Sequence, residues 1–285
     1  LIDRFYVDST IPATLTYAKS SDAPEDFVSS LGITVNTSGT TAAGQYAWVR
    51  QNIEGYNFAH LNFGTANAKT FTLSFWVKSS VTGILGGWFG AALNNRFQSF
   101  TYTILSANTW EYKTVTISGT WNNTNGVGLQ VSWSLSCGTN FRGATGSWSS
   151  SIFLGATGQT NITETAGATF NITGVQLETG DTATPFENRP YGQELALCQR
   201  YFYKVDKIIN ALAARFSLSS GGTNAWLPFP VTMRVSPSMV ATGTFTSGGG
   251  YMGTPLVGNS GIDGFQTVGA TSRAAGYVEY IYAID

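Results

Sequence analysis

The stretch ATFNITGVQLETGDTATPFENRPYGQELALCQRYFY, residues 168–203, decides how this chain is organised. Its first part alternates apolar and polar residues, which predicts a β-strand. Pro185 and Pro190 then exclude a central strand, because proline cannot donate a hydrogen bond to a sheet ladder. Apolar residues recur after them at a helical spacing: Leu195, Cys198, Tyr201 and Phe202. We therefore expect a strand that closes one β region, a rigid exit, and one short helix.

Upstream of this stretch, short alternating segments lie between turn residues. The clearest is KTFTLSFWVKS, residues 69–79, which places one set of apolar residues on a single face: Phe71, Leu73, Phe75 and Val77. Segments 97–105 and 110–118 also alternate, and the short loop between them predicts a β-hairpin. The glycine-rich GILGGWFGAALNNR, within residues 80–96, is interpreted as a loop.

In total, about ten to thirteen short strands with frequent turn signals and no amphipathic helix are expected before residue 185. This pattern predicts an all-β fold, an antiparallel jelly-roll β-sandwich. The predicted domains are a jelly roll over residues 1–185, a linker and short helix over 186–204, and a smaller C-terminal β domain over 205–285. Five segments are expected to form strands in the last domain: AARFSLS, AWLPFPVTMR, MVATGTF, GFQTVGA and GYVEYIYAI. The glycine-rich SGGGYMG and GNSGIDG are expected to be turns between them.

Charge is scarce and balanced along the chain. Charged residues make up 11% of the 285 residues and the net charge is −1, whereas charged residues are about 25% of a typical globular protein. The chain lacks the basic stripe that nucleic-acid binding requires. It also lacks an apolar run long enough for a transmembrane helix, so no membrane insertion is expected. Because the sequence begins at Leu1, we expect it to be a piece of a longer protein.

No catalytic or metal-binding motif stands out. His60 is the single histidine, no CxxC or GxSxG motif is present, and nothing in the sequence pairs Glu111 with Glu178 as glycoside hydrolysis would need. No enzymatic activity, cofactor or metal is expected. Cys137 and Cys198 could form a disulfide or remain buried thiols. One acidic group could hold a structural calcium, although solvated turns are the simpler interpretation: Asp3, Asp8, Asp22, Glu25 and Asp26.

Several segments resemble a family of bacteriophage virion proteins of the tail-fibre or head-fibre type, whose jelly roll is similar to carbohydrate-binding modules. The similar segments are TFTLSFWVKSS, ANTWEYKTVTISGTW, NGVGLQVSWSL and, most specifically, residues 173–203. The resemblance covers about residues 1–204, and PVTMRVSPS with YVEYIYAI extends it more weakly to the C-terminus. It implies a location on the virion surface, a homotrimeric fibre in contact with other virion proteins, and adsorption to bacterial surface polysaccharide.

Aromatic residues in polar loops are the candidates for sugar contact, because pyranose C–H groups stack on aromatic rings. The predicted carbohydrate-binding residues are Trp88, Phe89, Trp121, Arg142 and Trp148. Phe141 accompanies Arg142, and nearby asparagines could bind hydroxyl groups: Asn94, Asn95, Asn122, Asn123 and Asn140. The alternative is that these rings pack on the sandwich edges or against a neighbouring subunit. Three tryptophans within predicted strands are expected in the core or between the sheets: Trp76, Trp110 and Trp133.

The leading hypothesis is a non-enzymatic, trimeric fibre component that touches host glycans. The segment LCQRYFY is too apolar for a free linker, so the subunit interface is expected at Leu197, Arg200, Tyr201, Phe202 and Tyr203. One alternative is a purely structural decoration or connector protein without a ligand. Another is a carbohydrate-binding module attached to a polysaccharide-degrading enzyme.

Overall fold

The computed structural model describes residues 5–57, 69–91, 96–117, 127–205, 222–234, 256–261, 264–270 and 278–279. The chain forms two compact units, Leu1–Glu187 and Asn188–Asp285. Each is described by itself.

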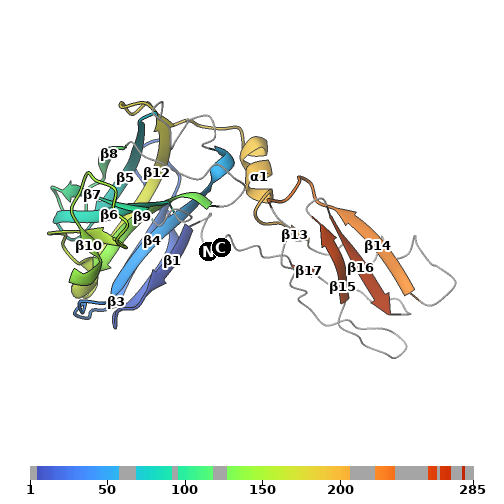
Figure 1. Ribbon diagram of the computed structural model, residues 1–285, viewed down its shortest axis with the longest axis horizontal. Coiled ribbons are helices and arrows are strands. Elements are labelled where there is room, and N and C mark those ends of the chain that lie inside the picture. Colours follow the sequence, from blue (N-terminus) through green and yellow to red (C-terminus); the bar gives the residue numbers. More distant parts are fainter. Residues whose placement is uncertain are drawn as a thin grey trace. The chain divides into compact units, whose positions relative to one another are not determined.

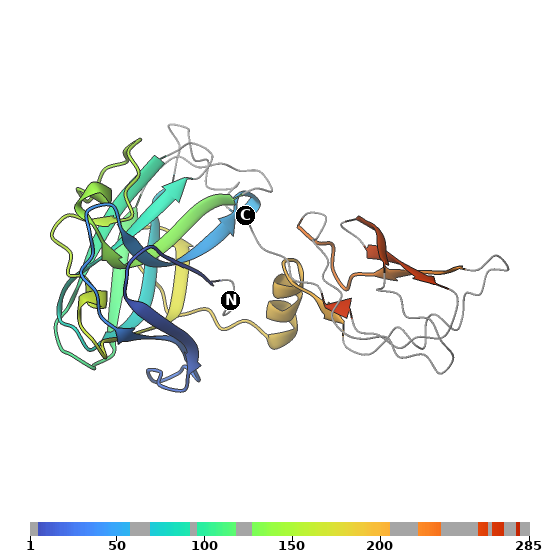
Figure 2. The same cartoon turned by 90° about the horizontal axis from the view of Figure 1, so that it is seen from below.

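The first unit is a sandwich of two five-stranded sheets (Figures 1 and 2). Sheet A has the order β1 (Phe5–Ser9), β4 (Tyr46–Glu54), β9 (Val127–Cys137), β6 (Gly83–Ala91), β7 (Arg96–Ile104). Sheet B has the order β2 (Thr14–Ser20), β3 (Ser30–Thr37), β12 (Thr169–Thr179), β5 (Phe71–Ser79), β8 (Glu111–Ile117). Neighbouring strands in both sheets are antiparallel. The prediction of an all-β, antiparallel jelly-roll sandwich is confirmed.

The core between the sheets follows from the alternation of each strand. The four residues predicted to share one face of β5 are each at most 1% exposed: Phe71, Leu73, Phe75 and Val77. Phe75 packs edge-on against Tyr102 of β7 and Trp133 of β9, with ring centroids 5.2 and 5.5 Å apart. Residues of both sheets therefore interdigitate in one apolar layer, as in other aligned sandwiches.

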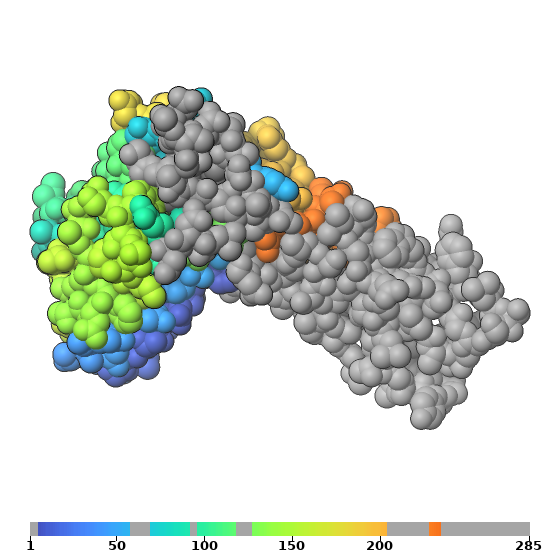
Figure 3. Space-filling model, in the orientation of Figure 1, coloured from blue at the N-terminus to red at the C-terminus, as the bar shows by residue number. Residues whose placement is uncertain are grey.

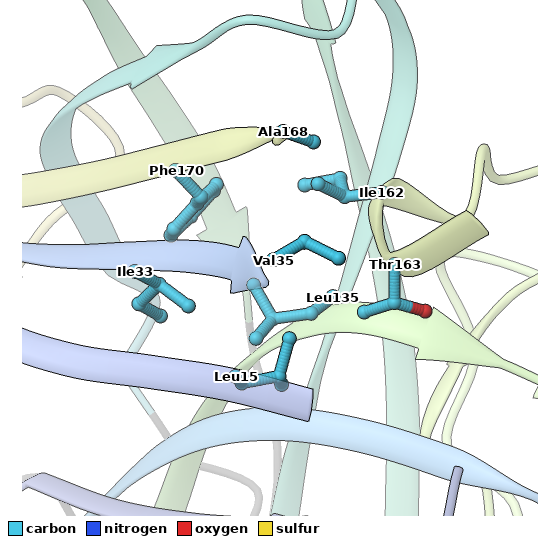
Figure 4. Close-up of a pocket in the computed structure, with 8 residues that line it drawn as sticks. All are labelled: Leu15, Ile33, Val35, Leu135, Ile162, Thr163, Ala168 and Phe170. Atoms are coloured by element: carbon cyan, nitrogen blue, oxygen red, sulfur yellow. The ribbon is translucent and has the colours of Figure 1, made fainter. Parts of the chain in front are cut away.

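A pocket at one end of this layer belongs to the core (Figure 4). It is lined by Leu15, Ile33, Val35, Leu135, Ile162, Thr163, Ala168 and Phe170. Thr163, from the 3₁₀ turn η4 (Ile162–Glu164), supplies the one hydroxyl among apolar side chains. A polar ligand would find too few hydrogen-bond partners there, so this pocket is not a candidate site.

The interpretation of the glycine-rich segment as a loop is wrong, because its residues Gly83–Ala91 form the strand β6. Its glycines admit neighbouring groups: a Cβ at Gly87 would collide with the ring of Phe100, and one at Gly90 would lie 2.7 Å from Trp88. Glycine within a strand often marks such a close approach. The loop-like composition of this strand therefore reflects close packing around its glycines.

The predicted hairpin of segments 97–105 and 110–118 is also wrong. Both segments are strands, but β7 pairs with β6 in sheet A and β8 pairs with β5 in sheet B. The connection therefore crosses from one sheet to the other. Both strands direct apolar residues into the same core from opposite sides, which alternation alone cannot distinguish from pairing.

The second unit contains the predicted short helix, α1 (Tyr191–Gln199). Its strands are β13 (Lys204–Val205) paired with β17 (Val278–Glu279), and a three-stranded sheet of β14 (Gly222–Pro228), β16 (Gly264–Ala270) and β15 (Leu256–Gly261). The expected GNSGIDG turn is partly wrong, since β15 continues through its first four residues. The expected strands AARFSLS and MVATGTF lie outside the described residues.

Candidate functional site

The predicted sugar-binding residues fall in different places. Trp88 and Phe89 lie in β6 and are 1% and 0% exposed, so their predicted position in a polar loop is wrong. Phe89 faces the core, where it contacts Phe71 and Phe100. A buried core ring cannot stack on a sugar. Trp88 faces away from this core and belongs to a separate cluster on the outside of sheet A, together with Trp48.

Of the other predicted residues, Arg142 begins the two-residue strand β10 (Arg142–Gly143) and Trp148 lies in a loop. Trp121 lies outside the described residues, as do the candidate asparagines 94, 95, 122 and 123, and His60. Arg142 is half-buried, and its Nε donates to the carbonyl oxygen of Cys137 at 2.8 Å while Nη2 donates to Oδ1 of Asn161 at 3.1 Å. Trp148 is partly buried against the core. Sugar contact by Trp121, Arg142 and Trp148 stays a prediction.

The outer surface of sheet A, here called face A, carries a regular grid of aromatic and hydroxyl side chains. Across β4 and β9, Trp48 is paired with Ser134 and Arg50 with Ser132. Across β9 and β6, Ser132 is paired with Trp88. A central column of small serines is thus flanked by two indoles, whose ring centroids are 6.2 Å apart at 88°.

Arg50 completes this grid at the edge of the sheet. Its guanidinium carbon lies 4.5 Å from the ring centroid of Trp48 and 5.9 Å from that of Tyr6. Tyr6 is the register partner of Arg50 on the edge strand β1. Next to them, the hydroxyl of Tyr46 donates to Oδ2 of Asp8 at 3.2 Å. Tyr6, Tyr46 and Arg50 are half-buried and Asp8 is exposed, so this edge of face A meets solvent.

Three buried donors of face A have no hydrogen-bond partner within the protein: Nε1 of Trp48, Nε1 of Trp88 and Nε of Arg50. Buried donors usually find a partner, so such groups require an explanation. Burial lowers the pKa of Arg50, and nearby Tyr6 and Asp8 oppose this shift. The guanidinium stays charged in any case, because arginine does not lose its proton in proteins.

Residues 138–160, here called the arm, cover the other part of face A. Ser99 donates to the carbonyl oxygen of Gly155 at 2.7 Å, and Gln159 donates through Nε2 to Ser134 at 3.1 Å. Leu154 of the arm packs with Trp48 and Trp88. The arm, yellow-green, lies at the surface of this unit in the space-filling view (Figure 3). The two indoles are consequently 5% and 1% exposed.

The outer surface of sheet B, here called face B, holds a second group of rings. Trp133 is fully buried, which confirms its predicted core position, but the same prediction is wrong for Trp76 and Trp110, which are half-buried at this surface. Tyr112 lies opposite Trp76 across β5 and β8 and is 43% exposed. Tyr112 is not among the predicted binding residues, although its alternation with Val115 and Ile117 indicates the outer face.

Acidic groups in the described residues are engaged locally. The four carboxyl groups with a shifted pKa are all lowered: Asp22, Glu111, Glu164 and Glu178. In Glu111, burial raises the pKa, but hydrogen bonds from Lys113 and from backbone N–H groups outweigh it. A glycosidase acid instead needs a raised pKa. Across the described ranges, no cluster of three or more His, Cys, Asp or Glu side chains could hold a metal ion.

The two cysteines are not joined by a disulfide. Burial raises the pKa of Cys137 to about 12, against the opposing charge of Arg142. A thiol in this state is inert, because the thiolate is the nucleophile. Within the part of the chain that the structure describes, no helix has the length and apolar character needed to cross a membrane.

No protein-family model and no curated protein matches the chain. Solved structures do match. The enzymatically active domain of tailspike protein 4 from bacteriophage CBA120 is 18% identical with a TM-score of 0.38, and the match covers 63% of this chain and 20% of that chain. A family 11 carbohydrate-binding module from Clostridium thermocellum, in complex with a β-1,3-1,4-mixed-linked tetrasaccharide, is 11% identical with a TM-score of 0.35, covering 63% and 91%. A CBM4 module is 15% identical with a TM-score of 0.35, covering 62% and 86%. Scores this low do not identify a ligand for this chain.

Proposed function

We propose that this chain is a carbohydrate-binding component of a bacteriophage fibre. It stands on the virion surface as a homotrimer, contacts other virion proteins, and adsorbs to bacterial surface polysaccharide without catalysing a reaction. The virion assignment is supported by the sequence resemblance of residues 173–203 to fibre proteins. The ligand class is supported by the chemistry of face A.

The observation that carries the proposal is the solvent-exposed edge of face A. Arg50 lies over Trp48 and beside Tyr6, while Tyr46 and Asp8 form a hydroxyl–carboxylate pair next to them. A binding site for a small polar ligand combines apolar rings with a few convergent polar groups. Aromatic faces suit the C–H side of a sugar, and a guanidinium and a carboxylate suit its hydroxyl groups.

The absence of catalysis is proposed from the state of the acidic groups. Each carboxyl group with a lowered pKa already accepts local hydrogen bonds; Glu178, for example, accepts from the backbone and side chain of Thr184 at 2.8 and 2.5 Å. Such a group stays ionised and is a poor general acid near neutral pH.

The trimer is proposed from helix α1. None of its residues is buried, and short helices in water gain most of their stability from packing of an apolar face. Leu197 and Phe202 are 37% and 43% exposed. Arg200 donates to the carbonyl oxygen of Thr232 at 3.3 Å, a contact within the second unit that holds the end of the helix. We place the interface at Leu197, Arg200, Tyr201, Phe202 and Tyr203.

A second candidate function is a structural connector without a ligand. The observation that favours it is the arm, which buries the indoles of Trp48 and Trp88. In that case face A would be a second small core, and its rings would stabilise the fold only.

Binding to purified lipopolysaccharides and capsular polysaccharides from a panel of bacteria tests the proposal. We expect the trimer to bind at least one polysaccharide, and the double variant Tyr6→Ala with Arg50→Ala to bind it at least tenfold more weakly. Val7→Ala on the same strand, exposed between Tyr6 and Asp8, is the matched control and should bind like wild type. Light scattering measures the oligomeric state. A folded protein that binds nothing across the panel supports the connector, and a monomer at high concentration rejects the trimer.

A further inference from the structure

We infer that face B carries a second carbohydrate site, floored by Trp76 and Tyr112. The inference takes its ligand class from the proposed function, but it rests on residues of the opposite sheet. The two rings are direct register partners on β5 and β8. Their centroids are 5.3 Å apart and their planes are tilted by 50°. Since β8 is the last strand of sheet B, the ring of Tyr112 borders an open edge.

The segment from Asp22 to Ser29 forms a wall along these rings. Phe27 of this segment lies over Gly174 of β12, where a Cβ would come within 2.6 Å of the phenyl ring and 3.1 Å of Trp76. Gly174 has a φ of +58° beside an irregularity in the strand register. Thr173 anchors the wall by donating from its hydroxyl to the carbonyl oxygen of Ser29 at 2.9 Å. A glycine at 174 therefore permits the approach of Phe27 to Trp76.

Polar groups that are held by hydrogen bonds lie at one end of the pair of rings. Asp22 accepts from Nζ of Lys78 at 2.6 Å and from Nε1 of Trp110 at 3.0 Å. Lys78 lies two residues after Trp76 on the same face of β5 and also 6.0 Å from the ring centroid of Trp110. The carboxylate and the ammonium hold each other in place, so both are oriented before a ligand arrives. Hydrogen bonds from Lys78 and then Trp110 keep the pKa of Asp22 lowered, and the group is ionised near neutral pH.

The rest of face B argues for a sugar and against a protein partner. Two residues that alternate outward with Tyr112 on β8 carry exposed hydroxyl groups, Thr114 and Thr116, whereas Thr72 and Ser74 of β5 are buried. Protein-binding surfaces concentrate apolar and aromatic residues in a buried centre. Here a small group of rings lies beside the exposed hydroxyls of β8 and the charged pair of Asp22 and Lys78, which matches a glycan with apolar C–H faces and polar edges. Two sites per chain, on opposite sheets, would add avidity to each subunit of a fibre.

The test uses the intact trimer and a polysaccharide that wild type binds, cut into defined oligosaccharides. Tyr112→Ala and Trp76→Ala are measured in the wild-type background and in the Arg50→Ala background. We expect either face-B change to weaken binding about tenfold in the Arg50→Ala background, since one stacked ring contributes roughly that factor. Tyr112→Phe keeps the ring and should bind like its parent. Thr16→Ala, exposed on the far edge strand of the same sheet, is the control.

Circular dichroism and light scattering show that each variant is folded and trimeric. Unchanged oligosaccharide binding in both face-B variants overturns the inference, even if the face-A variants lose binding and support the proposed site. The reverse result, loss in the face-B variants alone, keeps this inference and rejects the site on face A. If the face-B variants dissociate the trimer, face B is a subunit contact and the inference also falls.

Discussion

Faces A and B arise from the same alternation of side chains, yet the indole rings of face A are buried and the aromatic rings of face B are partly exposed. On face A, Trp48 and Trp88 are 5% and 1% exposed, because the arm returns over them with Leu154. On face B, the wall carrying Phe27 stays beside the rings and leaves Tyr112 43% exposed. The number of rings on a strand therefore does not decide whether they are buried. Their burial depends on whether another segment of the chain crosses them.

The largest expected contrast is in stability. Trp88→Ala should lower the free energy of unfolding by about 3–5 kcal/mol, because it leaves a cavity beneath the arm. Trp76→Ala should cost only about 1 kcal/mol, since the ring is half-buried at the surface. Urea denaturation followed by circular dichroism gives both values. Phe75→Ala, in the shared core, serves as the reference for a fully buried ring. Similar losses for Trp76 and Trp88 would contradict the contrast between the faces.

The next contrast concerns the arm. Arg142→Gln removes the donors to the carbonyl oxygen of Cys137 and to Asn161. Oδ1 of Asn161 still accepts from the backbone N–H of Cys137 at 3.0 Å, so the loss falls on the carbonyl oxygen of Cys137. Leaving one buried acceptor without this partner costs about 1–3 kcal/mol. We expect faster hydrogen exchange in residues 138–160, together with a shift of tryptophan emission as Trp48 and Trp88 meet water. Arg96→Gln, an exposed arginine on β7, should change neither. Faster exchange spread equally over sheet B would show that Arg142 supports the whole sandwich.

The sequence allowed the layers to be predicted, because the alternation of β5 reports directly which residues enter a core. It did not allow pairing to be predicted: β7 and β8 alternate as hairpin strands do, but they lie in different sheets. Exposure was the least predictable property. The glycine-rich composition of GGWFG indicated an exposed loop. The burial of Trp88 instead depends on residues about 65 positions later in the chain.

Sugar binding stays a prediction, whereas the structure does place the residues that were selected for it. Aromatic rings beside polar groups were expected, and both faces contain them. The expectation that sugar-binding rings lie in polar loops selected Phe89, which lies in the core. It left out Tyr6, Arg50 and Tyr112, because they lie in strands. Cross-strand neighbours form both proposed sites, and a single sequence does not show which strands are neighbours.

A smaller effect is expected from the backbone conformation of one glycine on face B. Gly174→Ala should cost about 1–3 kcal/mol, because φ is +58° and the new Cβ meets Phe27. Gly146→Ala is the matched control: φ is +85° there, but nothing lies within 4 Å. The difference between the two variants isolates the contact with Phe27. Thermal melts measure the stability, and oligosaccharide binding at face B should weaken in Gly174→Ala alone. Equal costs for both glycines would mean that Phe27 moves aside freely.

The smallest expected effect is the pH dependence of Asp22. Its pKa is lowered in the folded protein from the usual value of 3.8, first by the hydrogen bond from Lys78 and then by that from Trp110. Ionised Asp22 therefore stabilises the fold above pH 3.8, and this contribution is lost as the pH falls through the lowered folded value. Because the carboxylate is 43% exposed, the contribution should be no more than about 0.5 kcal/mol. Denaturation of wild type and Asp22→Asn should differ slightly at pH 6 and converge toward pH 3. If the difference persists at pH 3, the charge of Asp22 does not hold the wall in place. Thr173 and Gly174 would then suffice to keep Phe27 beside Trp76.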